Sequence, residues 1–367
     1  MLAAGVPCIP GYQGEDQGEA TLLRQAQEVG FPLMVKASAG GGGRGMRLVL
    51  AGDDLAEQLR SARSEAEGAF GSGELILERA VLEPRHVEIQ VFADAHGNAV
   101  YLGERDCSIQ RRHQKVVEEA PSPFVDGELR RRMGEAAVDA ARACDYRGAG
   151  TVEFLVDAEH NFYFLEMNTR LQVEHPVTEM VTGQDLVAWQ LAVAAGEVLP
   201  LAQEEIELRG HAVEVRLYAE DPRRGFLPQT GEIALFDYPV RRDIRVDHGV
   251  SGGQAITPHY DPMLAKLIAW GRDREEACRK LASAVEDTRL LGVNNNRLFL
   301  QHVLRHPVFR AGHATTAFIE QHFSDDHSVS SAVPGATTLA VAALLYALRD
   351  GEAVARWSSS TGERSVC

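Results

Sequence analysis

The chain has 367 residues and contains 53 Asp and Glu against 37 Lys and Arg, so its formal net charge is −16 at pH 7. A surface that binds the phosphates of a nucleic acid duplex would work against this negative field, so we expect no nucleic-acid partner. No run of residues reaches the roughly 18 apolar positions of a membrane span, so we expect no membrane partner. Hydrophobic residues make up 45% of the chain, enough for a sizeable core in two or three domains.

The first element with a clear pattern is a pair of strands joined by a glycine-rich loop. Residues 32–36 and 46–50 have β character, and the loop lies between them. Its glycines match the spacing of the dinucleotide fingerprint, but that motif must open a helix, and the Lys-Ser/Thr of a Walker A loop is missing. The pattern predicts a hairpin whose backbone N–H groups close over phosphates, with Lys36 beside them as a point charge. The alternative is a merely flexible linker.

A second segment, residues 104–119, is dense in cations and hydrogen-bonding groups and has acids at both ends. One interpretation is a nucleic-acid patch. Because the whole chain is strongly acidic, a small anionic ligand fits better.

The third element is a hairpin with acidic residues in both strands, residues 151–156 and 162–168. The predicted register pairs Asp157 with Phe162, Val156 with Tyr163, Phe154 with Leu165 and Glu153 with Glu166. Glu153 and Glu166 then face each other with Cβ atoms about 5 Å apart, and Asn168 shares their face. Two carboxylates and an amide oxygen suit Mg²⁺. The alternative is a solvated edge hairpin with two surface acids.

Polar residues continue beyond this hairpin. Arg170, Gln172 and Glu174 alternate, so they point to the side of the predicted metal ligands while the chain stays extended. Such a row is costly in a core and excessive for an edge strand, which indicates a functional site. Pro176 argues against a simple continuation into a helix.

The C-terminal half contains a strand and a helix with clear signals. Residues 211–219 alternate as a strand that includes Arg216, which without further context would be an ordinary edge arginine. Asp273 as N-cap and Glu276 in capping-box position predict a helix from about Arg274, with Gly292 as its stop.

Several of these segments together closely resemble the ATP-grasp biotin carboxylase family. The matching stretches are Val35-Lys36 with the loop at 40–45, Arg105-Asp-Cys-Ser-Ile-Gln-Arg-Arg-His-Gln-Lys115, Gly150-Thr-Val-Glu-Phe154 and Glu166-Met-Asn-Thr-Arg-Leu-Gln-Val-Glu-His-Pro176. The resemblance extends over residues 1–322. It implies an α+β fold with an ATP-grasp lid subdomain at 1–78, an antiparallel-sheet core with the metal and bicarbonate site at 79–205, a biotin carboxylase C-terminal α+β domain at 206–323, and a partly disordered linker or tail at 324–367.

The resemblance also implies a reaction in two steps. ATP phosphorylates bicarbonate to carboxyphosphate, whose breakdown delivers CO₂ to N1′ of biotin. The implied nucleotide residues are Lys36, Gly41, Gly42 and Gly43 at the phosphates, Glu78, Arg79, Ala80 and Val81 along the adenine, and His86, Gln110 and His113 lining the nucleotide. The implied ligands of Mg²⁺ or Mn²⁺ are Glu153, Glu166 and Asn168. Bicarbonate would be bound by Lys115, Arg170, Gln172 and the Val173 backbone, with Glu174 as its base, and Arg216 would stabilise the biotin enolate.

Within the family, residues 11–17 and 216–222 most resemble the biotin-containing α subunit of 3-methylcrotonyl-CoA carboxylases, enzymes of leucine degradation. This implies a biotinyl carrier domain and a carboxyltransferase β subunit as partners, a homodimer or larger hetero-oligomer, and a cytoplasmic location or, in a eukaryote, the mitochondrial matrix. The family's leading α/β domain and its biotinyl acceptor motif are not found in these 367 residues, so we expect a fragment. Acetyl-, propionyl- or geranyl-CoA systems, another ATP-grasp carboxylate ligase and a catalytically incompetent fragment are the alternatives.

Overall fold

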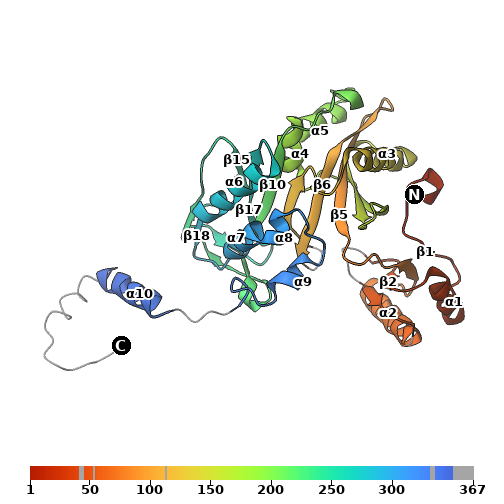
Figure 1. Cartoon of the computed structure of the whole chain (residues 1–367), viewed down its shortest axis with the longest axis horizontal. Coiled ribbons are helices and arrows are strands. Elements are labelled where there is room, and N and C mark those ends of the chain that lie inside the picture. Colours follow the sequence, from red (N-terminus) through yellow and green to blue (C-terminus); the bar gives the residue numbers. More distant parts are fainter. Residues whose placement is uncertain (41–44, 53, 112–113, 331–334, 350–367) are drawn as a thin grey trace.

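The computed structural model describes residues 1–40, 45–52, 54–111, 114–330 and 335–349. A smaller sheet lies beside the main body of the chain, with helices α1 and α2 packed on it (Figure 1). The strand order in this sheet is β1-β4-β2-β3. Its elements are β1 (Gly11–Tyr12), α1 (Glu19–Val29), β2 (Leu33–Ala37), β3 (Met46–Val49), α2 (Leu55–Phe70) and β4 (Leu75–Arg79).

The two strands predicted around the glycine loop are confirmed. β2 and β3 are antiparallel, and Lys36 lies opposite Met46. Leu33 and Val35 alternate with the partly exposed Met34 and Lys36 and are fully buried against the helices. The loop is therefore a connection between two paired strands, although residues 41–44 lie outside the described part of the chain.

The larger sheet has the strand order β15-β17-β10-β7-β6-β5-β8-β9. Every neighbouring pair in it is antiparallel. The bounds are β5 (Arg85–Ala93), β6 (Ala99–Arg111), β7 (Gln114–Ala120), β8 (Gly148–Val156), β9 (Phe162–Asn168), β10 (His211–Tyr218), β15 (Ile244–His248) and β17 (Met263–Gly271). The strand predicted at 211–219 is thus confirmed as β10.

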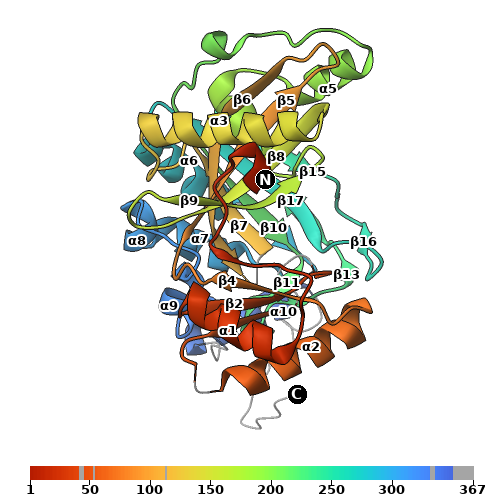
Figure 2. The ribbon, with the colours of Figure 1, turned by 90° about the vertical axis from the view of Figure 1, so that its right-hand side faces the viewer.

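One face of this sheet is apolar, because successive side chains of a strand point to opposite faces and apolar residues recur at every second position. In β5, Val87 and Ile89 belong to the cluster that packs against helix α3 (Gly127–Ala143). Helix α3 lies across the strands (Figure 2) and begins at Asp126, whose side chain accepts a hydrogen bond from the Leu129 N–H at 2.8 Å. The other face of β5 is also buried, although it presents His86, Glu88 and Gln90.

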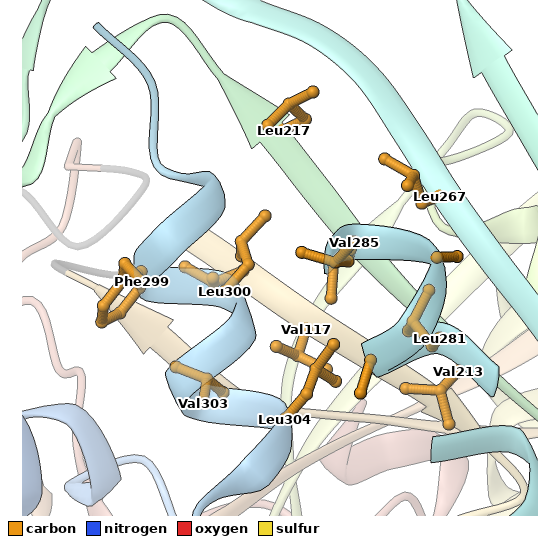
Figure 3. Close-up of a cluster of buried hydrophobic side chains, with 14 of the residues drawn as sticks. Val117, Val213, Leu217, Leu267, Leu281, Val285, Phe299, Leu300, Val303 and Leu304 are labelled. Carbon is orange, nitrogen blue, oxygen red and sulfur yellow. The ribbon is translucent and has the colours of Figure 1, made fainter. Parts of the chain in front are cut away.

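The same apolar face continues under the C-terminal helices. Helices α6 (Arg274–Asp287) and α7 (Arg297–Arg305) pack their buried side chains onto β7, β10 and β17 (Figure 3). Helix α6 starts as predicted, because the Asp273 side chain accepts from the Glu276 N–H at 2.8 Å. The predicted stop at Gly292 is wrong: the helix ends at Asp287 and a short strand, β18 (Arg289–Leu291), intervenes.

The remaining elements are short or peripheral. They are η1 (Leu2–Ala4), α4 (His175–Thr182), α5 (Leu186–Ala194), η2 (Gln203–Glu205), β11 (Glu220–Asp221), η3 (Pro222–Arg224), β12 (Leu227–Pro228), β13 (Gly231–Glu232), β14 (Leu235–Asp237), β16 (Ala255–Ile256), α8 (Pro307–Arg310), α9 (Phe318–Phe323) and α10 (Ala336–Arg349). Among the described residues, no helix is both long and apolar enough to cross a bilayer. The domain boundaries stay predictions. The predicted boundary at residue 205 lies between β7 and β10 in the sequence, yet these two strands are neighbours in the larger sheet.

The hairpin of β8 and β9 has a register that differs in part from the prediction. Glu153 lies opposite Glu166, as predicted, but the outer pairs are Phe154 with Phe164, Leu155 with Tyr163 and Val156 with Phe162. The register shifts between Glu153 and Phe154, where Leu165 is the extra residue of a bulge. Consequently Phe162 is buried in the core, and the predicted pairs of Phe154 with Leu165 and Val156 with Tyr163 are wrong.

Candidate active site

The second face of the larger sheet presents a row of buried polar side chains. It arises because the polar positions of each strand alternate with apolar ones that face the core. The row comprises Glu214 and Arg216 of β10, Glu118 and Lys115 of β7, Arg105 of β6, His86, Glu88 and Gln90 of β5, and Thr151 and Glu153 of β8. Helix α4 contacts β6, β7 and β10 and covers part of this face. Buried charges at this density require partners, and neighbouring side chains supply most of them.

Arg105 is the centre of this network and is fully buried. Its guanidinium donates to Glu88 at 2.5 Å, to Gln90 at 2.9 Å and to Thr151 at 3.2 Å. It also donates to Gln172 and Thr178, at 3.0 Å each, which belong to the segment covering the sheet. Arg105 therefore ties β5, β6 and β8 to α4 and to the turn that precedes it.

Lys115 joins three carboxylates. Its Nζ donates to Glu153 at 2.8 Å, to Glu174 at 2.7 Å and to Glu88. Burial alone would lower the pKa of Lys115, but the surrounding carboxylates raise it well above its usual range. Lys115 is therefore a fixed positive charge at the centre of the site.

The three predicted metal ligands lie together at the end of the β8–β9 hairpin. The Asn168 amide nitrogen is 3.0 Å from a Glu153 oxygen and 3.3 Å from a Glu166 oxygen. Despite its burial, Glu153 has a pKa far below the usual range, because His86 at 2.8 Å and Lys115 stabilise its charge. Glu153 is thus ionised and Glu166 is exposed, so this oxygen-rich donor set fits a divalent cation such as Mg²⁺.

The segment after β9 turns instead of staying extended. β9 ends at Asn168, and α4 begins at His175 with Pro176 in its first turn, where a missing N–H costs nothing. The expectation that Pro176 opposes a helix is therefore wrong, and so is the single extended row. Gln172 and Glu174 are buried in the network, whereas Arg170 is exposed.

Arg216 lies on the opposite side of Glu174 from Lys115. Its Nε donates to Glu118 at 2.6 Å, and a terminal nitrogen donates to Glu174 at 3.1 Å. Lys266, its cross-strand neighbour in β17, donates to the Val173 carbonyl at 2.6 Å. Glu174 thus accepts from two cations, and the Val173 backbone is held beside them.

The predicted nucleotide residues form a less compact group. Lys36 is ion-paired with Glu78 across β2 and β4. Arg79, Ala80 and Val81 lie at the exit from β4 toward β5, where the Arg79 and Ala80 N–H groups donate to the Pro10 and Pro32 carbonyls at 2.9 and 2.8 Å. His86 contacts Glu153, and Gln110 lies opposite Lys115 in the β6–β7 pairing. Gly41, Gly42, Gly43 and His113 lie outside the described residues.

Sequence reasoning missed several charged members of the network, namely Arg105, Glu88, Glu118, Glu214 and Lys266. Glu88 had a signal, because it is flanked by His86 and Gln90 at period two in an otherwise apolar strand. Glu214 had a similar signal, because it lies two residues before Arg216 and alternates with Val213 and Val215. Nothing in the sequence alone distinguishes Arg105 from the other cations around it.

Two family models match the chain. Residues 1–202 match "Carbamoyl-phosphate synthase L chain, ATP binding domain", and residues 214–321 match "Biotin carboxylase C-terminal domain". These ranges contain every candidate residue of the site.

Curated relatives agree with these matches. The chain is 54% identical over 326 residues to the mitochondrial methylcrotonoyl-CoA carboxylase subunit alpha of Rattus norvegicus, covering 89% of this chain and 46% of that protein. It is 54% identical over 322 residues to a biotin carboxylase of Halalkalibacterium halodurans, covering 88% and 71%. A propionyl-CoA carboxylase alpha chain of Ruegeria pomeroyi is 48% identical over 344 residues. The chain therefore spans about half the length of the methylcrotonoyl-CoA carboxylase relatives it matches.

Solved structures share the fold. The biotin carboxylase domain dimer of 2-oxoglutarate carboxylase from Hydrogenobacter thermophilus, in complex with MgADP, ADP and bicarbonate, has a TM-score of 0.84 and 45% identity, covering 90% of this chain and 73% of that one. Biotin carboxylase from Campylobacter jejuni, in a nucleotide complex, has a TM-score of 0.83 and 43% identity, covering 88% and 72%.

Proposed function

The chain belongs to the biotin carboxylase family, and on that premise we propose that it catalyses the ATP-dependent carboxylation of biotin by bicarbonate. The single observation that supports this most is the continuous hydrogen-bonded chain from Glu153 through Lys115 and Glu174 to Arg216. It connects a site suited to a nucleotide-bound metal with a cation suited to a second substrate. An ATP-dependent carboxylation needs both on one surface.

At one end of this chain, Glu153, Glu166 and Asn168 would hold Mg²⁺ or Mn²⁺, which would neutralise charge on the ATP phosphates. The amide of Asn168 now donates to both carboxylates, so its oxygen would have to turn toward the cation. Lys36 would leave Glu78 for the phosphates, and the glycine loop would close over them. Phosphoryl transfer depends on such positioning and on charge stabilisation more than on covalent chemistry.

In the centre, Lys115, Arg170, Gln172 and the Val173 backbone would bind bicarbonate. Arg170 is exposed, and its hydrogen bonds within the described residues are long, 3.4 Å to the Leu171 carbonyl and 3.5 Å to Asn168, so its guanidinium is available to an anion. Glu174 would take the bicarbonate proton as general base, because Lys115 and Arg216 keep it oriented.

At the other end, Arg216 would stabilise the negative charge that develops on biotin as its N1′ loses a proton. A guanidinium stays charged at any working pH, and Glu118 fixes its orientation through Nε at 2.6 Å. This leaves its remaining N–H groups to meet the substrate beside Glu174.

The final acceptor is proposed by likeness. Relatives from Rattus norvegicus, Mus musculus and Dictyostelium discoideum, at 52–54% identity, are methylcrotonoyl-CoA carboxylase alpha subunits. The propionyl-CoA carboxylase alpha chain of Ruegeria pomeroyi is 48% identical, so the likeness favours 3-methylcrotonyl-CoA over propionyl-CoA. A biotinyl domain, a carboxyltransferase β subunit and a second copy of the chain would be its partners. The bacterial cytoplasm or the mitochondrial matrix would be its location.

The test is phosphate release from Mg-ATP by the purified chain, with and without bicarbonate and free biotin. We expect release that requires bicarbonate, rises with biotin and falls by at least about a hundredfold in Glu166→Ala, because the metal loses a carboxylate ligand. Glu159→Ala, an exposed acid in the turn of the same hairpin, is the matched control and keeps the wild-type rate. Release that another carboxylic acid supports better than bicarbonate would instead indicate a different ATP-grasp ligase.

A further inference from the structure

Two buried glutamates beside Arg216 lack the partners that buried charges require. Glu214 of β10 is fully buried, and neither of its carboxylate oxygens has a hydrogen-bond partner among the described residues. Glu118 of β7 is also fully buried, and its second oxygen has no partner in that part of the chain either. An isolated carboxylate in such a place either takes up a proton or costs several kcal/mol.

The strand register brings the two acids together. Glu214 lies directly opposite Glu118 in the antiparallel pairing of β10 and β7. Cβ atoms of such pairs are about 5 Å apart, so two charged carboxylates here would repel strongly in a medium without water.

The nearby cations are committed to other groups. Charged groups that act on Glu214 are Glu118 from β7, Lys266 from β17, Arg216 from β10 itself and Glu174 from the turn before α4. On α4, His175 lies 3.9 Å from Glu179, whose carboxylate also accepts from Arg245 of β15 at 2.6 Å. Lys266 donates to the Val173 carbonyl and lies 3.4 Å from Asp247. Arg216 donates to Glu118 and Glu174. Within the part of the chain that the structure describes, neither cation forms a hydrogen bond with Glu214, because both donate to other acceptors.

We propose that Glu214 is a positioning residue, a neutral acid that shares its proton with Glu118 and thereby holds the Arg216 guanidinium between Glu118 and Glu174. The inference rests on the proposed function for the role of Arg216 at biotin. With one proton in the pair, Glu118 has a single charge that binds Nε of Arg216. Loss of that proton adds a second negative charge to the pair of Glu118 and Glu214. This charge draws the Arg216 guanidinium toward the sheet and away from the substrate.

The expected pH dependence has a definite sign. Burial raises the pKa of Glu214 well above its usual range, and burial likewise raises that of Glu118 to about 7. Because both pKa values are raised, the acid forms are favoured in the fold and are lost as the pH rises through these values. The pair therefore keeps its proton at neutral pH and releases it on the alkaline side.

The first measurement does not depend on activity. Exposed carboxyl groups titrate near pH 4, so at neutral pH the infrared absorption of a protonated carboxylic acid reports buried acids. We expect this absorption in the purified chain, its disappearance at alkaline pH and its loss in Glu214→Gln. Glu135→Gln, which removes an exposed acid, keeps it. An absorption that is the same in wild type and in a folded Glu214→Gln, or absent from wild type, overturns the proposal.

A second variant keeps the test decisive if Glu214→Gln does not fold. Glu118→Gln removes the negative neighbour and frees Arg216 to bind Glu214, so the absorption of Glu214 should disappear at a lower pH than in wild type. An unchanged midpoint would show that the two acids do not share a proton.

The catalytic measurement separates this inference from the proposed function. Glu214→Ala should lower the biotin-dependent part of phosphate release by about tenfold to a hundredfold, leaving the KM values for ATP and bicarbonate in place. Glu214→Gln, which mimics the neutral acid, should restore that part and extend it to higher pH. If the wild-type chain releases no phosphate, the proposed function fails for this chain, while the infrared result still decides the state of Glu214.

Discussion

At the scale of single residues, the site depends on buried charges that satisfy one another. Arg105 illustrates this, because all of its hydrogen-bonding capacity is used by groups on β5, β8 and the cover formed by α4. Removing one partner of such a network lowers the stability of the fold far more than replacing the whole network by apolar residues would, since the remaining charges stay buried without a partner.

We therefore expect Arg105→Met to lower the free energy of unfolding by about 3–5 kcal/mol, since Glu88 would lose its guanidinium partner. Urea unfolding followed by circular dichroism measures this. Arg131→Met is the matched control: its ion pairs with Glu128 and Glu135 are exposed, so this variant should leave the free energy of unfolding almost unchanged. Equal losses in the two variants would contradict a structural role for the buried network.

The strand residues found from the sequence, such as Glu153 and Arg216, alternate with core positions, whereas Gln172 and Glu174 lie in the turn before α4. The opposition of Glu153 and Glu166 was predicted and is confirmed, because period two fixes which side chains share a face. Arg105 escaped prediction because the register shifts along β6, between Asp106 and Ile109 and again before Gln110, leave no regular alternation around it. The assigned roles of the individual site residues stay predictions.

At the scale of elements, start signals were more informative than stop signals. The N-terminus of α6 was predicted from Asp273, whose side chain caps the first turn at the Glu276 N–H. Its C-terminus was misplaced, because Thr288 ends the helix without glycine and an added strand follows. In the β8–β9 hairpin the bulge at Leu165 could not be foreseen, since the adjacent apolar residues offer equally good registers on either side of it.

The capping interaction of α6 predicts a measurable loss. Asp273→Ala should lower the free energy of unfolding by about 1 kcal/mol, because the Glu276 N–H loses its acceptor. Glu275→Ala removes an exposed acid from the same first turn; it is the control and should change the free energy of unfolding little. Thermal unfolding of the two variants in parallel provides the comparison, and an unaffected Asp273→Ala would mean that water replaces the cap.

At the scale of the whole molecule, the larger sheet does not stop where the sequence changes character. β10 pairs with β7 over Ala212 to Val215, and β17 and β15 extend the sheet further. The predicted metal ligands and Arg216 thus belong to one continuous sheet. Sequence patterns identify single strands such as β10 but contain no information on which distant strand becomes the neighbour of each, so this continuity could not be predicted.

Hydrogen exchange tests the continuity. Amides in the middle of β10 should exchange with the same free energy as those in the middle of β6, because both open only when the shared sheet unfolds. Amides of the short peripheral strands β11 and β12 should exchange much faster. Exchange of β10 and β17 at a distinctly lower free energy than β5 and β6 would show that the C-terminal segment unfolds on its own.

The pairing of β7 with β10 also limits how this gene can be shuffled. The two family models meet between residues 202 and 214, which makes that point an obvious crossover for making chimaeras from two relatives. Such a crossover would seat β7 from one parent against β10 from the other, so the opposed Glu118 and Glu214 and the neighbouring Val117 and Val215 would come from different lineages. In chimaeras joined there, the boundary between the two parental sequences runs through the candidate active site. An exchange beyond residue 323 instead leaves every strand pair of the larger sheet within one parent.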